Sequence, residues 1–119
     1  MIKLTIGTQH FIPDKKITQY AIKKIGSLDK YLPKTAKSAH GNVILVEDDS
    51  RGEGNIFVCE AIIHVPESSP IQAKEATLNM YAAIDIVEAK LKTQIIKYKD
   101  KHNPKWRRSK ILLNKLFLK

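Results

Sequence analysis

Lysines recur at helical spacing in the segment 79–101, NMYAAIDIVEAKLKTQIIKYKDK, and the chemistry open to them is the neutralisation of phosphate charge. With about 100° of rotation per residue, one face of the predicted helix is apolar. That face holds Met80, Ile84, Val87, Leu91, Ile95 and Tyr98. One edge of the face carries Lys90, Lys97 and Lys101, and the opposite edge carries Lys92 and Lys99. The pattern indicates a helix that packs on a core and presents its edges to an anionic partner, although a charge run can also serve only to keep a surface solvated.

A second lysine stripe is predicted on an earlier helix. Pro13 and Asp14 form a start signal, because proline suits the first turn and an acid suits the positive end of the helix dipole. The buried stripe that follows is Ile17, Ala21, Ile25 and Leu28, and the pattern ends at Leu32 and Pro33. Another face carries Lys16, Lys23 and Lys30 at seven-residue intervals, with Lys24 nearer the apolar edge. Together the two stripes predict a cationic helix surface.

The charge is distributed unevenly along the chain. Residues 79–119 hold eleven Lys/Arg against three acids, whereas residues 1–78 hold ten against nine, within a total net charge of +9. Such an asymmetry costs self-repulsion and does nothing for the fold, so it indicates an anionic partner. Nucleic acid is the first candidate and an acidic membrane surface is the second.

Other chemistry is weakly supported. The histidines, His10, His40, His64 and His102, lack metal-ligand spacing, and no glycine-rich phosphate loop precedes a helix. The acids of residues 47–53 do not follow the spacing of a calcium-binding loop. Cys59, the single cysteine, lies inside an apolar run and is expected in the core. We therefore expect no catalytic residue, no metal site, no cofactor and no small-molecule substrate, in a protein that is not an enzyme.

The remaining apolar patterns predict four strands. Ile2, Leu4 and Ile6 alternate with polar residues in a short strand that Gly7 closes. Residues 43–46 and 56–65 are β-branched-rich runs joined by a loop of glycines and acids, which predicts a hairpin, and residues 71–74 supply a short last strand. In the second run Phe57, Cys59, Ala61, Ile63 and Val65 point to one face, and Val58, Glu60, Ile62 and His64 point to the other. The order βαβββα predicts an α+β fold, a two-layer sandwich whose four-stranded sheet carries both helices on one face.

Length and composition predict a single domain. A chain of 119 residues that is 43% hydrophobic can bury one core. We expect an α+β domain over residues 1–102 and a basic amphipathic tail over residues 103–119, which could dock on the domain, extend along RNA or lie on a membrane. The expected location is cytoplasmic, because we find no signal-peptide pattern, no run of about 18 apolar residues, and only one cysteine.

Several segments resemble one family. The motif NMYAAID and the following KLKTQIIKYKDK are similar to the helix start and basic helix of the ribosome hibernation-promoting factors, short ribosome-associated translation inhibitors also called protein Y. The segments KLTIG, KKIGSLDKY and FVCEAIIHVP match in the same order. The resemblance implies a fold similar to double-stranded-RNA-binding domains and stress-linked binding to the small ribosomal subunit and its rRNA, in the channel of mRNA and of A- and P-site tRNA. Translation would stop because the factor competes with mRNA and tRNA, and the factor would be a monomer away from the ribosome.

The resemblance also implies which residues contact rRNA. The matching positions are Lys24 and Lys30 on the first helix, and Lys90, Gln94, Lys97, Lys99 and Lys101 on the second. Ser27 and Thr93 stand where the family commonly has a lysine and an arginine, and Lys23 and Lys92 could compensate for the missing charges. The helix-start motif comprises Asn79, Met80, Tyr81 and Asp85. There, asparagine replaces the usual aspartate but can still cap the helix, and the tyrosine and aspartate are expected to pack rather than to touch RNA.

The residues themselves leave two functions open. A folded rRNA groove presents phosphates and 2′-hydroxyls more than readable base edges, which suits two lysine-striped helices. The tyrosines, Tyr20, Tyr31, Tyr81 and Tyr98, fit core-edge positions better than a stacking platform, which disfavours single-strand binding. The alternative function is a general basic module that binds structured RNA or an acidic membrane surface without specificity for ribosomes.

Overall fold

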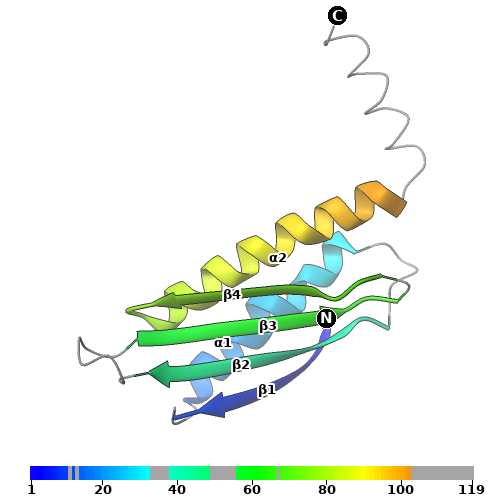
Figure 1. Ribbon diagram of the computed structural model, residues 1–119. Coiled ribbons are helices and arrows are strands. Elements are labelled where there is room, and N and C mark those ends of the chain that lie inside the picture. Colours follow the sequence, from blue (N-terminus) through cyan, green and yellow to red (C-terminus); the bar gives the residue numbers. More distant parts are fainter. Residues whose placement is uncertain (11, 13, 33–37, 49–55, 67, 103–119) are drawn as a thin grey trace, which may run out of the picture.

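In the computed structural model, the protein is a four-stranded mixed sheet with two helices on one face. The structure describes all residues except 11, 13, 33–37, 49–55, 67 and 103–119, and it describes no side chains for residues 99–102. The strands are β1 (Lys3–Gln9), β2 (His40–Asp48), β3 (Ile56–His64) and β4 (Ile71–Thr77). The helices are α1 (Lys15–Gly26), the short 3₁₀ helix η1 (Ser27–Tyr31) and α2 (Met80–His102). The strands lie in the order β1-β2-β3-β4, with β1 parallel to β2 and the other pairs antiparallel (Figure 1). The predicted fold class is confirmed.

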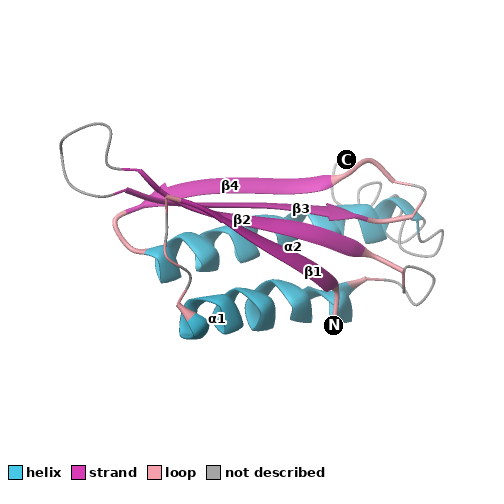
Figure 2. Ribbon diagram, turned by 90° about the horizontal axis from the view of Figure 1, so that it is seen from below, coloured by secondary structure: helices cyan, strands magenta, loops and turns pink. Residues whose placement is uncertain are grey.

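The core lies between the sheet and the helices. Figure 2 shows α1 and α2 side by side below the sheet, while the other side of the sheet has no helix over it. Most fully buried side chains come from the segments that the sequence predicts to face the core, and Ala83 is an addition to the predicted stripe of α2. The predicted ones include Ala21, Ile25, Val43, Leu45, Ala61, Ile63, Ile84, Val87, Leu91 and Ile95. Cys59 is also fully buried, as expected. Among the described residues no polar or charged residue is buried, so the contact between the sheet and the helices is stabilised by apolar packing.

Three strands are longer than the sequence predicts, and one of them is β2, which spans His40–Asp48 where residues 43–46 were expected. Gly7 does not close β1, because the parallel ladder to β2 continues through the pairs Gly7↔Ile44 and Gln9↔Val46. A glycine weakens an edge strand but does not interrupt its hydrogen-bonded ladder, so the expected end was wrong. β4 likewise runs beyond residue 74 to Thr77, which pairs with Phe57 of β3.

The first helix ends earlier than the periodic pattern suggests. Asp14 lies at the predicted start of α1 and caps the helix by accepting a hydrogen bond from the Lys16 N–H at 2.9 Å, while Pro13 lies outside the described residues. α1 stops at Gly26, whose carbonyl oxygen accepts a hydrogen bond from the Ile2 N–H at 2.8 Å. A Cβ at Gly26 would lie 2.8 Å from the Met1 side chain, so the helix end docks directly on the start of the chain. The chain then tightens into η1, which still buries Leu28.

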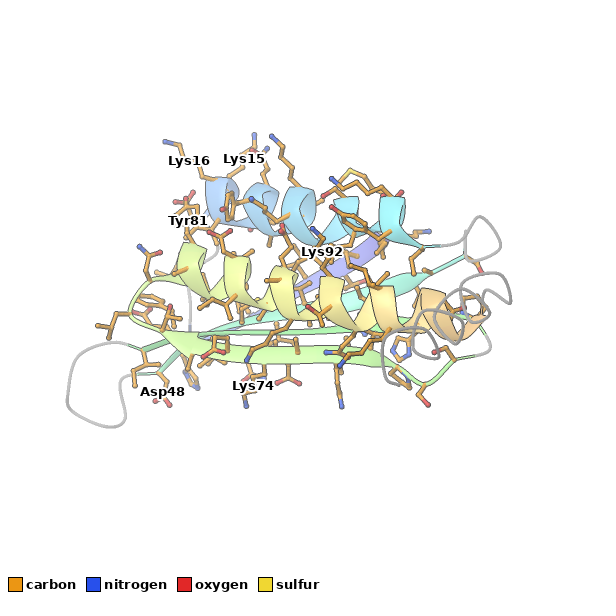
Figure 3. The ribbon with its side chains drawn as sticks, turned by 90° about the horizontal axis from the view of Figure 1, so that it is seen from above. Lys15, Lys16, Asp48, Lys74, Tyr81 and Lys92 are labelled. Carbon is orange, nitrogen blue, oxygen red and sulfur yellow. The ribbon has the colours of Figure 1, made fainter. Side chains whose placement is uncertain are left out.

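The sheet face away from the helices, termed here the open face, is formed by the alternate residues of each strand. Its central residues include Ile44, Val46, Val58 and Ile62, which are all partly exposed. Its two edge strands carry Lys3 on β1 and Lys74 on β4, and Figure 3 shows Lys74 pointing away from the helices. The predicted strand phase is confirmed, with one side of β3 buried and the other partly in contact with solvent. Within the described residues, no helix is long and apolar enough to cross a membrane.

Candidate nucleic-acid interface

The start of α2 is fixed by Asn79. Its side-chain oxygen accepts a hydrogen bond from the Tyr81 N–H at 2.8 Å, and its carbonyl accepts one from the Ala83 N–H at 3.1 Å. The Thr77 hydroxyl in turn accepts a hydrogen bond from the Asn79 N–H at 3.0 Å and donates one to the Asn79 carbonyl. Asparagine therefore caps the helix without a charge, as the sequence predicts. Met80, the next motif residue, is buried in the core.

A polar contact joins the two helices near this start. The Tyr20 hydroxyl of α1 donates a hydrogen bond to the Asp85 carboxylate of α2, and the Lys24 Nζ lies 4.0 Å from the same carboxylate. The rings of Tyr20 and Tyr81 meet edge to face, with centroids 5.0 Å apart. The hydrogen bond to Asp85, helped by desolvation, raises the pKa of Tyr20 to about 12. Asp85 and Tyr81 thus pack α1 against α2, and the carboxylate compensates part of the charge of Lys24.

Further along the same seam, cations gather around Tyr31. The Nζ atoms of Lys30 and Lys92 lie 5.2 Å and 4.8 Å from the centroid of the Tyr31 ring. Such contacts hold an ammonium group near an aromatic face by electrostatic attraction. Figure 3 shows Lys92 between α2 and α1. A groove of about 340 Å³ opens here, lined by Tyr20, Lys23, Lys24, Ser27, Leu28, Lys30, Tyr31 and Glu88. Four of the predicted RNA-binding lysines are thereby brought together on the seam between the helices.

The opposite edge of α2 faces the edge strand β4. The Lys90 Nζ lies 2.5 Å from the Glu75 carboxylate, and this charged hydrogen bond lowers the pKa of Glu75. Gln94 bonds the backbone of Gln72 in both directions, accepting from its N–H at 3.3 Å and donating to its carbonyl at 2.6 Å. Both side chains therefore attach α2 to the sheet. From the sequence we expected both side chains only to contact RNA, because helical periodicity does not show which edge of a helix meets a strand.

The predicted RNA-binding residues thus fall into two groups. Lys23, Lys24, Lys30 and Lys92 lie together along the seam between α1 and α2, which we call the seam group. Lys90, Gln94 and Lys97 lie on the edge of α2 that faces β4, where Lys97 is exposed. The side chains of Lys99 and Lys101, and the whole predicted tail from 103 to 119, lie outside the described residues.

Between these groups α2 presents an outer ridge that the sequence analysis missed. Ile86 and Ile96 are exposed by 38% and 43%, and Ala89 and Thr93 between them are also exposed. The Thr93 hydroxyl donates to the Ala89 carbonyl at 3.1 Å, so it faces its own helix. At about 100° per residue these four positions fall opposite the buried stripe, so the sequence contained the signal. Because the side chains along this ridge are uncharged, a partner can approach the flanking lysines without meeting further charges.

The structure adds one histidine pair that spacing did not reveal. His40 and His64 face each other across β2 and β3, with ring centroids 5.2 Å apart. Among the described residues, no group of three or more His, Cys, Asp or Glu side chains is placed to hold a metal ion. Burial raises the pKa of the Cys59 thiol to about 12, which keeps that sulfur protonated and unreactive at neutral pH.

Fold and surface together define a small α+β domain whose helix layer carries the cationic side chains. The sequence profile described as Sigma 54 modulation protein / S30EA ribosomal protein matches residues 4–103. The chain belongs to this family, which confirms the family suggested by the sequence motifs.

Individual relatives agree with this assignment. The chain is 30% identical over 105 residues to a ribosome hibernation promotion factor of Lactococcus lactis subsp. cremoris, a match that covers 88% of this chain and 54% of that protein. The chain therefore spans about half the length of that curated relative. Its fold is similar to the protein Y N-terminal domain of Thermus thermophilus, with a TM-score of 0.67, 22% identity, and coverage of 82% of this chain and 97% of that one. A ribosomal subunit interface protein from Coxiella burnetii gives a TM-score of 0.66 at 21% identity, covering 82% and 98%.

Proposed function

We propose that this protein is a ribosome-associated hibernation factor that binds rRNA of the small subunit through its helix layer and inhibits translation by occupancy. The observation that carries the proposal is a set of cations with no acidic partner among the described residues. Lys23, Lys30 and Lys92 of the seam group and Lys97 on the other edge of α2 belong to this set. Family membership, and relatives named for ribosome hibernation and the ribosomal subunit interface, support the ribosome as the partner.

The mechanism we infer needs no chemical step. Lysines on two rigid helices neutralise rRNA phosphates and release counterions, which makes the affinity strongly salt-dependent. A bound domain then fills the channel used by mRNA and tRNA, so these ligands and the factor exclude each other. Off the ribosome the protein is a monomer in the cytoplasm. The outer ridge of α2, with neutral side chains between lysines, suits close approach to the shallow minor groove of an RNA helix.

Sedimentation of the purified protein with ribosomes tests the partner. The protein should move with small subunits and with whole ribosomes on a sucrose gradient at low salt, and it should leave them as salt is raised. The second candidate, an acidic membrane surface, is favoured by exposed Ile86 and Ile96 beside lysines. Flotation with liposomes that contain anionic lipid, together with no ribosome binding, would replace our proposal by that one.

Cell-free translation tests inhibition by occupancy. Inhibition should rise in proportion to the fraction of ribosomes occupied, reverse when excess tRNA and mRNA are supplied, and leave rRNA uncleaved. We expect these results because a factor that only occupies its site binds reversibly and converts no substrate. Inhibition at far less than one protein per ribosome, or new rRNA fragments on a gel, would show that the protein acts as an enzyme.

A further inference from the structure

One of the residues that line the groove on the seam between α1 and α2 is the small Ser27. Ser27 follows directly after α1, and its hydroxyl turns back to donate to the Lys24 carbonyl at 3.2 Å. The side chain therefore occupies little of the space between Lys23, Lys24 and Lys30. Because Ser27 lines the groove, a longer side chain at position 27 should occupy part of this space.

The groove has two distinct ends. The contacts Tyr20 to Asp85 and Tyr31 to Lys92 show that α1 with η1, and α2, run side by side in the same direction. At the first end the charge of Lys24 is partly compensated by Asp85. At the second end Lys30 and Lys92 sit over the Tyr31 ring without an acidic partner among the described residues. An anionic group should therefore prefer the second end.

The rest of the lining suits the remainder of a nucleotide. The volume of about 340 Å³ is larger than a phosphate group needs and falls at the small end of the range for ligand sites. Leu28 and the Tyr20 ring supply apolar contact. The Glu88 carboxylate, which also lines the groove, can accept hydrogen bonds from ribose hydroxyls or from a base amino group.

We propose that this groove is a subsite for a single nucleoside 5′-phosphate unit, with the phosphate near Lys30 and Lys92 and the nucleoside toward Tyr20. The unit is either one residue of a bound RNA strand or a free nucleotide, which share this chemistry. The inference deepens the proposed function, because it rests on the helix layer as the RNA-binding surface. If the unit is a free nucleotide, a small ligand would change the ability of this surface to bind RNA.

Binding of adenosine 5′-monophosphate, followed by two-dimensional NMR of the labelled protein, tests the subsite. The nucleotide should shift the amide signals of Ser27, Lys30 and Tyr31, and adenosine or inorganic phosphate alone should bind more weakly.

Three variants of Ser27 test the shape of the groove. Ser27→Lys fills the groove yet adds a positive charge, and Ser27→Phe fills it without one. Both should weaken nucleotide binding at least tenfold, whereas Ser27→Ala, which keeps the space, should bind as the parent does. Thermal unfolding of each variant checks that it folds.

The outcomes separate shape from charge. If the lysines attract nucleotides only as a diffuse positive field, Ser27→Lys will bind adenosine 5′-monophosphate more tightly than the parent, and the subsite is refuted. It is equally refuted if the parent shows no binding at millimolar nucleotide. Loss of both nucleotide and ribosome binding in Ser27→Phe assigns the subsite to an RNA residue, and loss of nucleotide binding alone assigns it to a free nucleotide. The parent's own cosedimentation with ribosomes tests the proposed function separately.

Discussion

Tyr20 and Asp85 form the residue pair that holds the two helices in register. The hydrogen bond favours the protonated tyrosine, and the pKa of Tyr20 rises to about 12 from its usual 10.0. A pKa raised in the folded state stabilises the fold at all pH values below the unfolded pKa. The contribution should therefore be complete below pH 10 and should disappear as the pH rises to about 12.

Tyr20→Phe tests this pair. The substitution should lower the free energy of unfolding by about 1 kcal/mol at pH 7, the net value of a hydrogen bond that is partly open to solvent. Urea unfolding at pH 7 and near pH 11.5 should show that the difference between parent and variant shrinks at the higher pH. Asp85→Asn is the partner variant, and a double-mutant cycle isolates the pair. A stability difference that does not change between the two pH values would contradict the assigned hydrogen bond.

At the scale of elements, the sheet is held to the helices by one face only. Ile63 is fully buried, whereas its neighbour Ile62 points to the open face and is partly exposed. Ile63→Ala should cost about 2–5 kcal/mol because it leaves a cavity under the helices. Ile62→Ala, the same chemical change on the other face, should cost clearly less. Chemical denaturation of both variants gives the comparison, and equal losses would mean that the strand phase is misassigned.

The contact between α2 and the edge strand β4 can be tested separately from RNA binding. Gln94→Ala removes the acceptor for the Gln72 N–H, so hydrogen exchange at this amide should accelerate. Lys97→Gln, on the same edge of α2, should leave that exchange rate unchanged but weaken ribosome binding. A Gln94→Ala variant with normal exchange and strongly reduced ribosome binding would instead return Gln94 to a direct role in RNA contact.

Sequence periodicity was sufficient to predict the buried residues of elements that have one apolar face and one polar face. The stripes on both helices and the alternation in β3 predicted the buried residues, because burial repeats with the period of the element. Strand ends were less predictable, since Gly7 and residues 75–77 are placed by pairing with neighbouring strands. The groove was not predictable either, because it depends on the helix ending at Gly26 and on contacts between α1 and α2.

At the scale of the whole molecule, the two faces differ in kind. The helix layer carries the seam group and the ridge of α2, whereas the open face carries Lys74 near the Glu60 carboxylate, at 3.9 Å, and Lys3 at its edge. Net charge alone attracts any polyanion, but only a charged face fixes the orientation of a bound RNA. We therefore expect ribosome binding on the helix side.

The most direct test is the salt dependence of binding to purified small subunits, measured for two double variants with equal charge. Lys23→Gln with Lys30→Gln removes two charges from the seam group, and Lys3→Gln with Lys74→Gln removes two from the open face. The plot of log affinity against log salt should become less steep by about two units for the first variant, because two phosphate contacts are lost. It should stay parallel to that of the parent for the second variant. Equal changes in both, or no change in the first, would contradict binding through the helix layer.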